Sequence, residues 1–572
     1  MCIRDRSKKG FGQAFSIVSE AGAGKSRLLY EFRKVVANED VIILDGKSLS
    51  FNKNVAYHPV IEILKASFDI LESDNDFEKI NKIKKGLKIL SVDEDTVLIF
   101  LLELLSVKDS GFNKTSMSPE SKKDRTTEAL KRIALKESEF KPLVLLFEDL
   151  HWIDKNSEEY LKIFLDSISG ARIFLIFTYR PEFVPTWGGK SYHNQINLNR
   201  LSNREGLLIA HHLLGTDKIH INLEDLILGK TEGIPFFIEE FVKSLKDLGA
   251  LEKKDGRFVL SGDFQKVSIP STIQDVIAAR VDTLPESSKA VLQVGSAIER
   301  EFNYQLVKRV TNLEDNELLP AISKIQDAEL LFERGIFPDT IYIFKHALTR
   351  DVIYDSILTK RKKQLHEDIG NAFEALYGDR IEEYYGILAE HYLISKNYVK
   401  AAEYFRLAGK KAERVVSFLD AITCGEKWVD CLEMLPSTVD VEKQIIDART
   451  TLGFYHAQLF RWQNTKKAIE PIVKLAKKHK YKKRLAQIYS LAGIHSHFIN
   501  EDYQKAVKYL TKSIRIAEES NNFISLIFSN HFLGHVFVDN CEFEKGHHHI
   551  KKALEIVEMG NVFWSIALHK AC

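Results

Sequence analysis

The fold of the N-terminal part is decided by the stretch Phe15-Ser-Ile-Val-Ser-Glu-Ala-Gly-Ala-Gly-Lys-Ser26. It begins as a short apolar strand and ends where a helical pattern of apolar residues starts. Between the two, Gly22 and Gly24 permit backbone angles that turn successive N–H groups toward one point. A helix that starts near Lys25 adds the positive end of its dipole at the same point. This order of strand, glycine-rich turn and helix predicts a phosphate-binding loop in a parallel α/β domain.

The residue types of the loop indicate a nucleotide, ATP or ADP, together with Mg²⁺. Lys25 is expected to reach the β- and γ-phosphate oxygens, and the Ser26 hydroxyl to ligate the metal. Ser19 stands where the loop pattern has glycine, which leaves the geometry of the first turn open. The predicted nucleotide-binding residues of the loop are Glu20, Ala21, Gly22, Ala23, Gly24, Lys25, Ser26 and Arg27.

Two further strand ends complete the predicted site. The apolar run Pro142–Phe147 ends in Glu148 and Asp149. In phosphate-loop enzymes one such carboxylate holds Mg²⁺ and another orients the attacking water. We therefore assign Glu148 to the metal and Asp149 to the base, with the reverse assignment left open. The run Ile173–Phe177 ends in Thr-Tyr-Arg180, and we expect Arg180 to sense the γ-phosphate, with a surface ion pair as the alternative.

Length and composition exclude several classes of protein. The 572 residues correspond to about four domains at roughly 150 residues each. The 81 Lys and Arg residues against 80 Asp and Glu give a net charge of +1, so no overall field favours nucleic acid or an anionic membrane. The longest apolar stretch, Val97–Leu105, is far shorter than the roughly 20 residues of a membrane span. The five cysteines lack metal-ligand or redox spacing, which indicates reduced thiols and predicts a cytoplasmic location.

Changes of pattern along the chain predict four domains. Strands alternate with helices in residues 1–195, as in a helix-covered parallel sheet, and residues 1–6 are expected to be translated adaptor sequence. A charged helical insertion without a recognisable motif lies at about 60–135. Residues 196–265 predict a helical lid, and residues 266–362 predict short helices with a hairpin near 330–332 and 341–344. Residues 363–572 are helical throughout.

Internal repeats mark the C-terminal part. Tyr398-Val-Lys-Ala-Ala-Glu-Tyr404 is echoed by Tyr503-Gln-Lys-Ala-Val-Lys-Tyr509, and pairs of a small or apolar residue with glycine recur at 452–453, 492–493 and 533–534. Small residues at fixed places let paired helices pack closely, and neighbouring pairs must stack to bury their faces. We therefore predict an all-α helical solenoid, with a non-repeating helical bundle as the alternative, and we expect the natural chain to continue beyond residue 572.

Six motifs in this order resemble the signal-transducing (STAND) branch of the AAA-type ATPases, over almost all of the chain after the first dozen residues. They are Glu20–Arg27, Phe147–Asp154, Thr178–Phe183, Glu232–Glu240, Ser271–Arg280 and Phe344–Leu348. The sequence looks most like predicted ATPases that are fused behind class III adenylate/guanylate cyclase domains and followed by tetratricopeptide repeats. The departures from that pattern include a missing or replaced segment before the phosphate loop, the lack of a cyclase domain and of a C-terminal helix-turn-helix in this sequence, and a repeat period of about 40 residues, which exceeds the usual 34.

The resemblance implies further site residues. Gly233 and Pro235 match a Gly-x-Pro motif whose proline packs on the adenine base. Residues 266–362 would form a winged helix. His346 falls where related switch proteins place a histidine that contacts the β-phosphate of ADP and holds the closed state; a structural histidine is the alternative. The repeats would be a sensor or partner platform.

The resulting hypothesis is an ATP-dependent molecular switch, a slow regulatory ATPase that hydrolyses ATP to ADP with Mg²⁺. Its nucleotide state would be coupled to a protein partner or ligand on the repeats. A cyclase domain in a longer natural chain and a nucleotide-dependent homo-oligomer are further expected partners. The alternative is a DNA-binding AAA-type initiator or transcriptional regulator that grips duplex DNA with its winged helix, and a third reading is a scaffold with a vestigial site.

Overall fold

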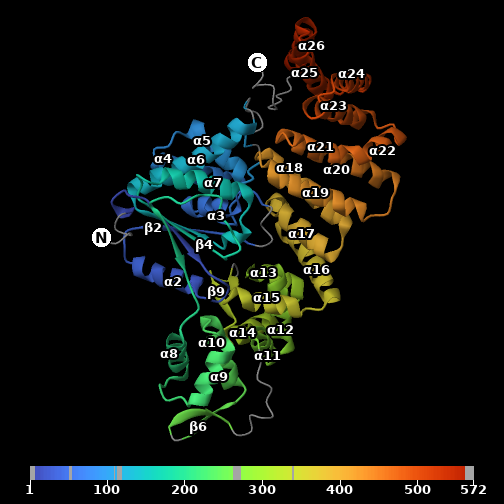
Figure 1. Cartoon of the computed structure of the whole chain (residues 1–572). Helices are drawn as coiled ribbons and strands as arrows, with labels where there is room; N and C mark the ends of the chain where they lie inside the picture. The colour runs from blue at the N-terminus through green and yellow to red at the C-terminus, as the bar shows by residue number, and fades with distance from the viewer. Residues whose placement is uncertain are drawn as a thin grey trace. The chain divides into compact units, whose positions relative to one another are not determined.

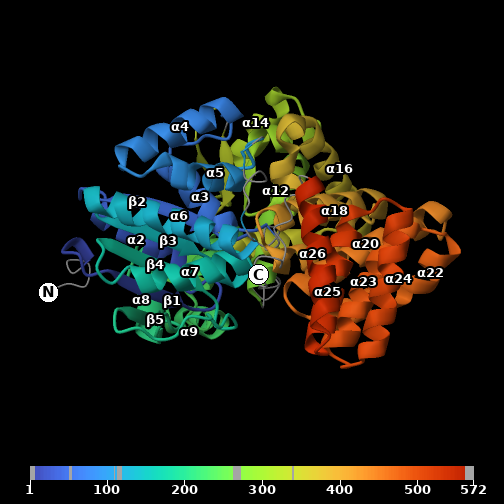
Figure 2. The same cartoon turned by 90° about the horizontal axis from the view of Figure 1, so that it is seen from above.

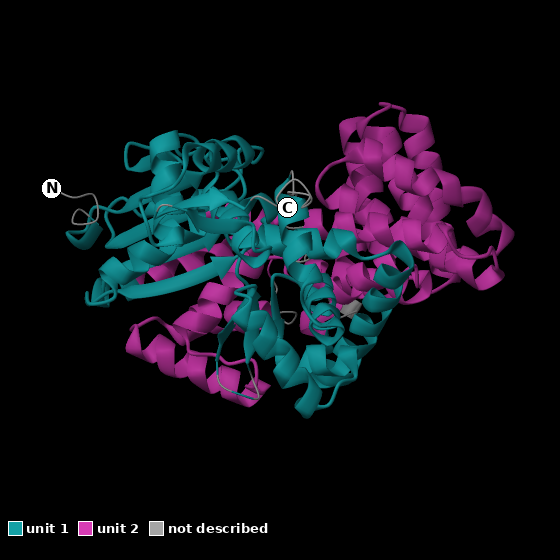
Figure 3. Ribbon diagram, turned by 90° about the horizontal axis from the view of Figure 1, so that it is seen from below, with its two compact units in different colours: residues 1–51, 137–153, 162–381 teal, residues 52–136, 154–161, 382–572 magenta. Residues whose placement is uncertain are grey.

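The computed structural model describes residues 7–49, 55–108, 110–111, 117, 119–254, 256–261, 272–335, 337 and 340–560 (Figure 1). The expected adaptor sequence 1–6, Ser271 and the predicted boundary at 265/266 lie outside these residues. The chain divides into two compact units, 1–51 with 137–153 and 162–381, and 52–136 with 154–161 and 382–572 (Figure 3). This division separates residues 52–136 from the predicted domain 1–195. The boundaries between the four predicted domains stay predictions.

The first unit contains a five-stranded parallel sheet of order β2-β3-β4-β1-β5. Its strands are β1 Gln13–Val18, β2 Ile42–Lys47, β3 Leu143–Glu148, β4 Ile173–Tyr179 and β5 His193–Asn197. Four of the five lie at apolar runs that predict strands, Phe15–Val18, Val41–Leu44, Pro142–Phe147 and Ile173–Phe177, and β5 was not predicted. Strands β3 and β4 are buried along their whole length, as expected for inner strands of a parallel sheet. The carboxyl ends of β1, β3 and β4 therefore lie side by side at one edge.

Helix α2 (Lys25–Val36) follows β1 directly and packs on the sheet. Its Phe32 stacks on Phe174 of β4, with 5.7 Å between the ring centroids. Leu29 is buried between the helix and the strands, while its neighbour Leu28 is exposed. The apolar face of α2 thus fixes the helix N-terminus at the carboxyl end of β1, where the loop lies.

The predicted lid is helical and also contains a short hairpin that was not predicted. Its elements are α8 Asn203–Leu214, α9 Ile221–Thr231, α10 Pro235–Asp247, β6 Leu251–Lys254 and β7 Arg257–Leu260. Ser202 and Glu205 form a reciprocal capping box that starts α8, and Gly215 in a left-handed conformation ends it. Pro235 occupies the first turn of α10, where its missing N–H costs no hydrogen bond.

The next part of the first unit combines helices with a three-stranded antiparallel sheet of order β8-β10-β9. The hairpin predicted near 330–332 and 341–344 is confirmed, and the three-residue strand β8 was missed. The elements are α11 Ile273–Asp282, α12 Glu286–Ile298, β8 Glu301–Asn303, α13 Tyr304–Thr311, α14 Asp315–Asp327, β9 Leu331–Arg334, β10 Ile341–Phe344, α15 Ala347–Ser356 and α16 Thr359–Tyr377.

The second unit contains helices and no strand among its described residues, and its repeats form successive packed helices (Figures 1 and 2). The repeated glycines make the packing close: a Cβ on Gly493 of α23 would lie 2.6 Å from Leu510 Cγ of α24. The insertion helices belong to this unit. The repeat helices are α17 Tyr385–Ser395, α18 Tyr398–Arg414, α19 Phe418–Glu433, α20 Val439–Gln458, α21 Trp462–Ile469, α22 Val473–Lys478, α23 Lys482–Phe498, α24 Tyr503–Glu519, α25 Phe523–Asp539 and α26 Phe543–Gly560.

The insertion helices that belong to the second unit pack against the start of the repeats. They are α3 His58–Ser67, α4 Asp76–Ile89 and α5 Glu94–Leu104, with part of α6 Pro119–Phe140. Lys79 of α4 is almost fully buried and bonds Glu383 at 2.8 Å, and Arg414 of α18 forms an ion pair with Glu103 of α5. Among the described helices, none is both long and apolar enough to cross a bilayer.

Candidate functional site

The loop between β1 and α2 curls around the ammonium group of Lys25. Gly22 and Gly24 have φ of +79° and +107°, in the left-handed region that favours glycine. The φ of Ser19 does not lie in that region. The Lys25 Nζ donates to the carbonyl oxygens of Ser19 (2.7 Å) and Glu20 (3.0 Å) and to Ser19 Oγ (3.1 Å). Serine is therefore compatible with the first position of the loop, because its backbone needs no positive φ and its hydroxyl helps to hold the lysine.

The remaining loop residues lie at the surface of the first turn of α2. Ser26 and Arg27 are exposed, and Arg27 pairs with Glu31 one turn later at 2.7 Å. Glu20 is also exposed and contacts Arg200 at 3.4 Å. The hydroxyl of Ser26 is thus open to a ligand at the helix N-terminus, whereas Arg27 points along the helix surface.

The Gly-Ile-Pro segment of the lid fits directly against the loop. Phe236 N donates to Gly22 O at 3.3 Å. A Cβ on Gly22 would lie 3.3 Å from both Ile234 Cγ2 and Phe236 Cβ, so a side chain there would crowd this segment. Gly233 has φ of +71°, and a Cβ on it would lie 2.3 Å from Leu201 O. The segment therefore needs glycine at Gly233, and Pro235 starts α10 beside the loop.

His346 lies in contact with the same segment. Its ring centroid is 3.9 Å from that of Phe236. Burial lowers the pKa of His346 to about 4, so the ring is neutral at pH 7. Its Nε2 is buried and has no hydrogen-bond partner within the part of the chain that the structure describes. Such an orphaned polar atom beside a phosphate loop fits a ligand group that satisfies it.

The two predicted carboxylates point to different surroundings. Asp149 N donates to Thr178 Oγ1 at 3.0 Å, and the negative charge of Asp149 raises the pKa of Lys25 against the larger, lowering effect of burial. The Oε1 of Glu148 instead accepts from Arg33 Nη2 of α2 at 3.0 Å. The structure thus brings Asp149 to the surroundings of Lys25 and holds Glu148 against a helix.

Arg180 also acts on the loop. Its positive charge lowers the pKa of Lys25, which places the two cations in one electrostatic environment. No ion pair joins Arg180 to another residue in the described ranges. A second cation next to the loop lysine is suited to a group with several negative charges.

The sequence interpretation missed two residues of this region, Arg300 and His151. Arg300 Nη1 lies 3.4 Å from Asp149 Oδ2, although no motif surrounds Arg300 in the sequence. The ring nitrogens of His151 are buried without a hydrogen-bond partner among the described residues, and burial lowers the pKa of His151 to about 4. His151 could have been found, because it lies inside the motif Phe147–Asp154. Asp154 of that motif is buried, and its Oδ1 accepts hydrogen bonds from the backbone N–H groups of Tyr57 and Ser157.

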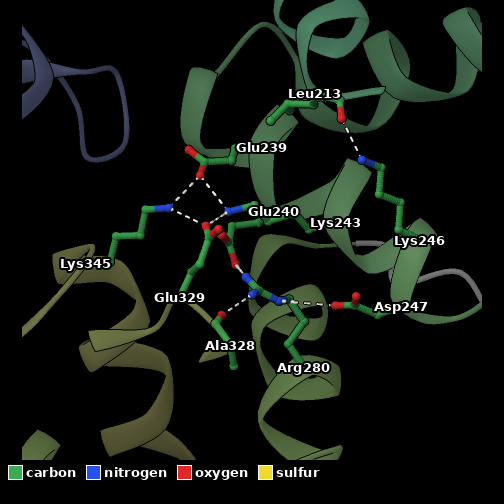
Figure 4. Close-up of polar contacts among 10 residues, drawn as sticks. All are labelled: Leu213, Glu239, Glu240, Lys243, Lys246, Asp247, Arg280, Ala328, Glu329 and Lys345. Atoms are coloured by element: carbon green, nitrogen blue, oxygen red, sulfur yellow. Dashed lines mark hydrogen bonds and ion pairs between the residues drawn. The ribbon is translucent and has the colours of Figure 1, made fainter. Parts of the chain in front are cut away.

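A polar network continues from α10 into the antiparallel sheet (Figure 4). Glu239 of α10 accepts from both Lys243 and Lys345, each at 2.8 Å, and Glu329 bonds the same two lysines. These lysines lower the pKa of Glu239 to about 2. Lys345 directly precedes His346, so the network joins the helix that starts at the loop to the segment that carries the histidine.

A buried ion pair lies beside this network. Arg280 of α11 pairs with Glu240 of α10, and both side chains are less than a tenth exposed. Arg280 Nη2 also donates to Ala328 O at 2.6 Å, and Asp247 lies 3.7 Å from its Nε (Figure 4). The extra contacts satisfy the remaining donors of the guanidinium, which a buried charge requires.

The residues present fit a nucleotide with Mg²⁺. The loop N–H groups, Lys25 and Arg180 suit the phosphates, and the exposed hydroxyl of Ser26 with the nearby carboxylate of Asp149 offers oxygen ligands. The described residues contain no group of three His, Cys, Asp or Glu side chains arranged for a metal. Mg²⁺ that is bound mainly by phosphates and water needs only one or two protein oxygens.

Comparison with known proteins supports this assignment. Residues 3–176 match the family model described as AAA ATPase domain, so the chain carries such a domain and the match supports an ATPase. An uncharacterized protein of Rhizobium meliloti (strain 1021) is 22% identical over 446 residues, which are 78% of this chain and 43% of that protein. This chain therefore spans less than half of the length of that relative.

Two solved structures are similar at low identity. The first is a Signal Transduction ATPase with Numerous Domains (STAND) protein with a tetratricopeptide repeat sensor from Pyrococcus horikoshii, 13% identical, with a TM-score of 0.37, over 98% of this chain and 76% of that one. The second is a Walker-type ATPase of Pyrococcus abyssi, 11% identical, with a TM-score of 0.28, over 61% of this chain and 93% of that one. Likeness at these scores does not bear on function.

Proposed function

We propose that the chain is an ATP-dependent switch in which the nucleotide bound by the loop controls the contact between the lid and the segment around His346. The observation that carries the proposal is the position of Phe236. Its backbone N–H bonds the loop at Gly22, and its ring contacts His346. A movement of the loop can therefore reach His346 through Phe236 alone.

Each site residue has a proposed role in this switch. Lys25 and the loop N–H groups hold the phosphates, Ser26 is a metal ligand, Arg180 senses the γ-phosphate and Pro235 packs on adenine. Mg²⁺, when bound, would neutralise charge on the β- and γ-phosphates. His346 contacts the β-phosphate of ADP through its unpartnered Nε2 and so holds the closed state.

The roles of the two carboxylates follow from their surroundings. Because Asp149 acts electrostatically on Lys25, we propose it as the carboxylate that faces the nucleotide and orients the attacking water. Glu148 can serve as the metal ligand only when Arg33 releases it, since the two form an ion pair of 3.0 Å. Arg300 would hold Asp149 in place until the nucleotide changes.

Coupling to the rest of the first unit would run through α10. Glu239 lies one turn after Pro235 and bonds Lys345, which precedes His346. A shift of the start of α10 would therefore change both the contact between Phe236 and His346 and the ion pairs of Glu239. We propose that these contacts have two alternative arrangements, one for each nucleotide state. The repeats would receive the signal, a protein partner or ligand, and a cyclase domain or further copies of the chain would respond.

The test is the nucleotide content of the purified chain, released by denaturation and identified by chromatography. About one ADP per chain is expected, because a switch of this kind holds ADP tightly at rest. Lys25→Ala should remove the nucleotide, and His346→Ala should release ADP while ATP still binds. His211→Ala, at a half-buried histidine of α8 away from the loop, is the matched control. Retention of ADP by both histidine variants would overturn the role of His346.

DNA binding is less well supported. Two cations of the proposed winged helix are not free to hold phosphates, since Lys308 pairs with Asp315 at 2.6 Å and Arg334 with Glu301 at 2.9 Å. A shift of labelled duplex DNA by the purified chain at low salt, lost steeply as salt rises, would restore this alternative.

A further inference from the structure

The repeats enclose a groove of about 810 Å³, which lies entirely within the second unit. Helices α18 and α20 contribute most of its walls, with α19 and α23 beside them. The volume falls in the range of sites that hold a small ligand or a short peptide segment. Lys122 of the insertion helix α6 also lines it, whereas no residue of the nucleotide site does.

One wall of the groove is cationic. Arg406 and Lys410 of α18 line it one helical turn apart. Two other arginines of the lining are neutralised internally, since Arg414 pairs with Glu103 and Arg484 with Asp447. Arg406 and Lys410 form no ion pair with any residue that the structure describes. The groove therefore presents two available positive charges about 6 Å apart along the helix.

A second wall of the groove is formed by α20. Gln444, Thr451 and Gln458 recur every seven residues along it, with Phe454 between them. Amide and hydroxyl groups both donate and accept hydrogen bonds, which is what a peptide backbone requires. Gln444 uses one donor on Asp440 of its own helix at 2.8 Å. The row from Gln444 to Gln458 is about 21 Å long, which matches about six residues of extended peptide.

We propose that this groove binds an extended, acidic peptide segment of a partner protein. Side chains two apart in an extended strand point the same way and are about 6.7 Å apart, so two such carboxylates reach both Arg406 and Lys410. The alternate side chains then face α20, where half-buried Phe454 favours apolar groups. The occupant is thus a segment in which acidic and apolar residues alternate.

Nucleic acid fits the groove less well. Glu413 also lines it, one turn from Lys410, and would repel a continuous chain of phosphates. A peptide can present its carboxylates on one side only, facing α18. The inference deepens the proposed function, because it names the kind of partner that the repeats receive, but binding to the groove can be measured without any nucleotide.

The test is fluorescence anisotropy of a labelled peptide, Gly-Asp-Leu-Asp-Phe-Asp-Gly, with the full chain. Two control peptides carry Asn for Asp, or the same residues with the three Asp contiguous. The variant is Arg406→Gln with Lys410→Gln. Its matched control is Lys474→Gln with Lys477→Gln, which removes two charges from exposed positions of α22 outside the groove.

The alternating acidic peptide should bind about five- to twentyfold tighter than either control peptide, as two exposed charge pairs allow. The groove variant should abolish this preference, and the α22 variant should keep it. Equal binding of the three peptides, no binding at millimolar peptide, or equal effects of the two variants would overturn the proposal. Displacement of the peptide by oligothymidylate, lost in the groove variant alone, would replace it with a nucleic-acid site. If the peptide fails to bind while the chain still carries ADP, only this inference fails.

Discussion

Replacing Gly233 by alanine tests whether the lid must approach the loop as closely as the structure shows. Gly233 and Gly215 have nearly the same φ, +71° and +69°, in the range that L side chains rarely adopt. A Cβ on Gly215 would meet nothing within 4 Å, whereas one on Gly233 would lie 2.3 Å from the carbonyl oxygen of Leu201. The two alanine variants therefore share the backbone strain and differ only in the clash.

The magnitudes follow from these contacts. An alanine in the left-handed region costs about 1–2 kcal/mol, which is the whole effect expected for Gly215→Ala. In Gly233→Ala the neighbouring backbone must also move, which stretches the hydrogen bond from Leu201 N to Gly233 O, 2.8 Å long. Loss of a buried hydrogen bond costs about 1–3 kcal/mol more, so Gly233→Ala should cost about 2–5 kcal/mol in all.

Two measurements separate the variants. Each kcal/mol lowers the thermal midpoint by about 2–4 °C in a domain of 150–250 residues, so the drop for Gly233→Ala should be two to three times that for Gly215→Ala. Because Phe236 N bonds Gly22 O, displacement of the segment should also weaken binding of a fluorescent ATP analogue at least tenfold in Gly233→Ala alone. Equal drops in midpoint together with unchanged nucleotide affinity would refute the reasoning.

Three further changes probe other parts of the molecule. Asp149→Asn should lower steady-state phosphate release by about 10²- to 10⁴-fold with ATP binding retained, and a larger loss in Glu148→Gln would reverse their roles. Arg280→Ala should cost about 3–5 kcal/mol in thermal unfolding, because it leaves the Glu240 carboxylate buried without its partner; adding Glu240→Leu should recover much of it, and no recovery would contradict this account. Burial, reinforced by a neighbouring carboxylate, raises the pKa of Asp420 to about 7, so the folded chain holds this proton more tightly than the unfolded chain and stability should fall as pH rises from about 4 to about 7. Asp420→Asn should reduce that fall in thermal midpoints measured at pH 5 and 8, because burial also raises the pKa of Asp154 and that group remains, whereas an unchanged slope would assign the fall to groups other than Asp420.

The parts of the site that could be predicted from the sequence have local causes. Gly22, Gly24 and Lys25 act within a few residues of one another, and the strand before them fixes their position. The strand ends at Asp149 and Arg180 could be placed for the same reason, since carboxyl ends of parallel strands meet at one edge. The side-chain directions could not, because whether Glu148 faces the nucleotide or Arg33 depends on packing against α2.

The remaining features depend on contacts between distant residues. Arg300 meets Asp149 across 151 positions of sequence, and its own neighbours form no pattern that points to it. Strand β8, Glu301–Asn303, is too short to show an alternation and exists only because β10 pairs with it. The insertion carries no motif, and its place beside the repeats rests on ion pairs such as that of Lys79 with Glu383. Propensity and periodicity contain no information about such pairings.

Each of the two compact units is built from three separate segments of the chain, which limits where the protein can be divided into fragments. The polypeptide passes from one unit to the other at five places, near 51/52, 136/137, 153/154, 161/162 and 381/382. A fragment that starts at residue 382 would therefore lack the insertion helices and would expose Glu383 and Arg414 without the partners they have in the whole chain. Neither unit is therefore a contiguous segment that could be cut out, or exchanged with another protein, by a single break at each end.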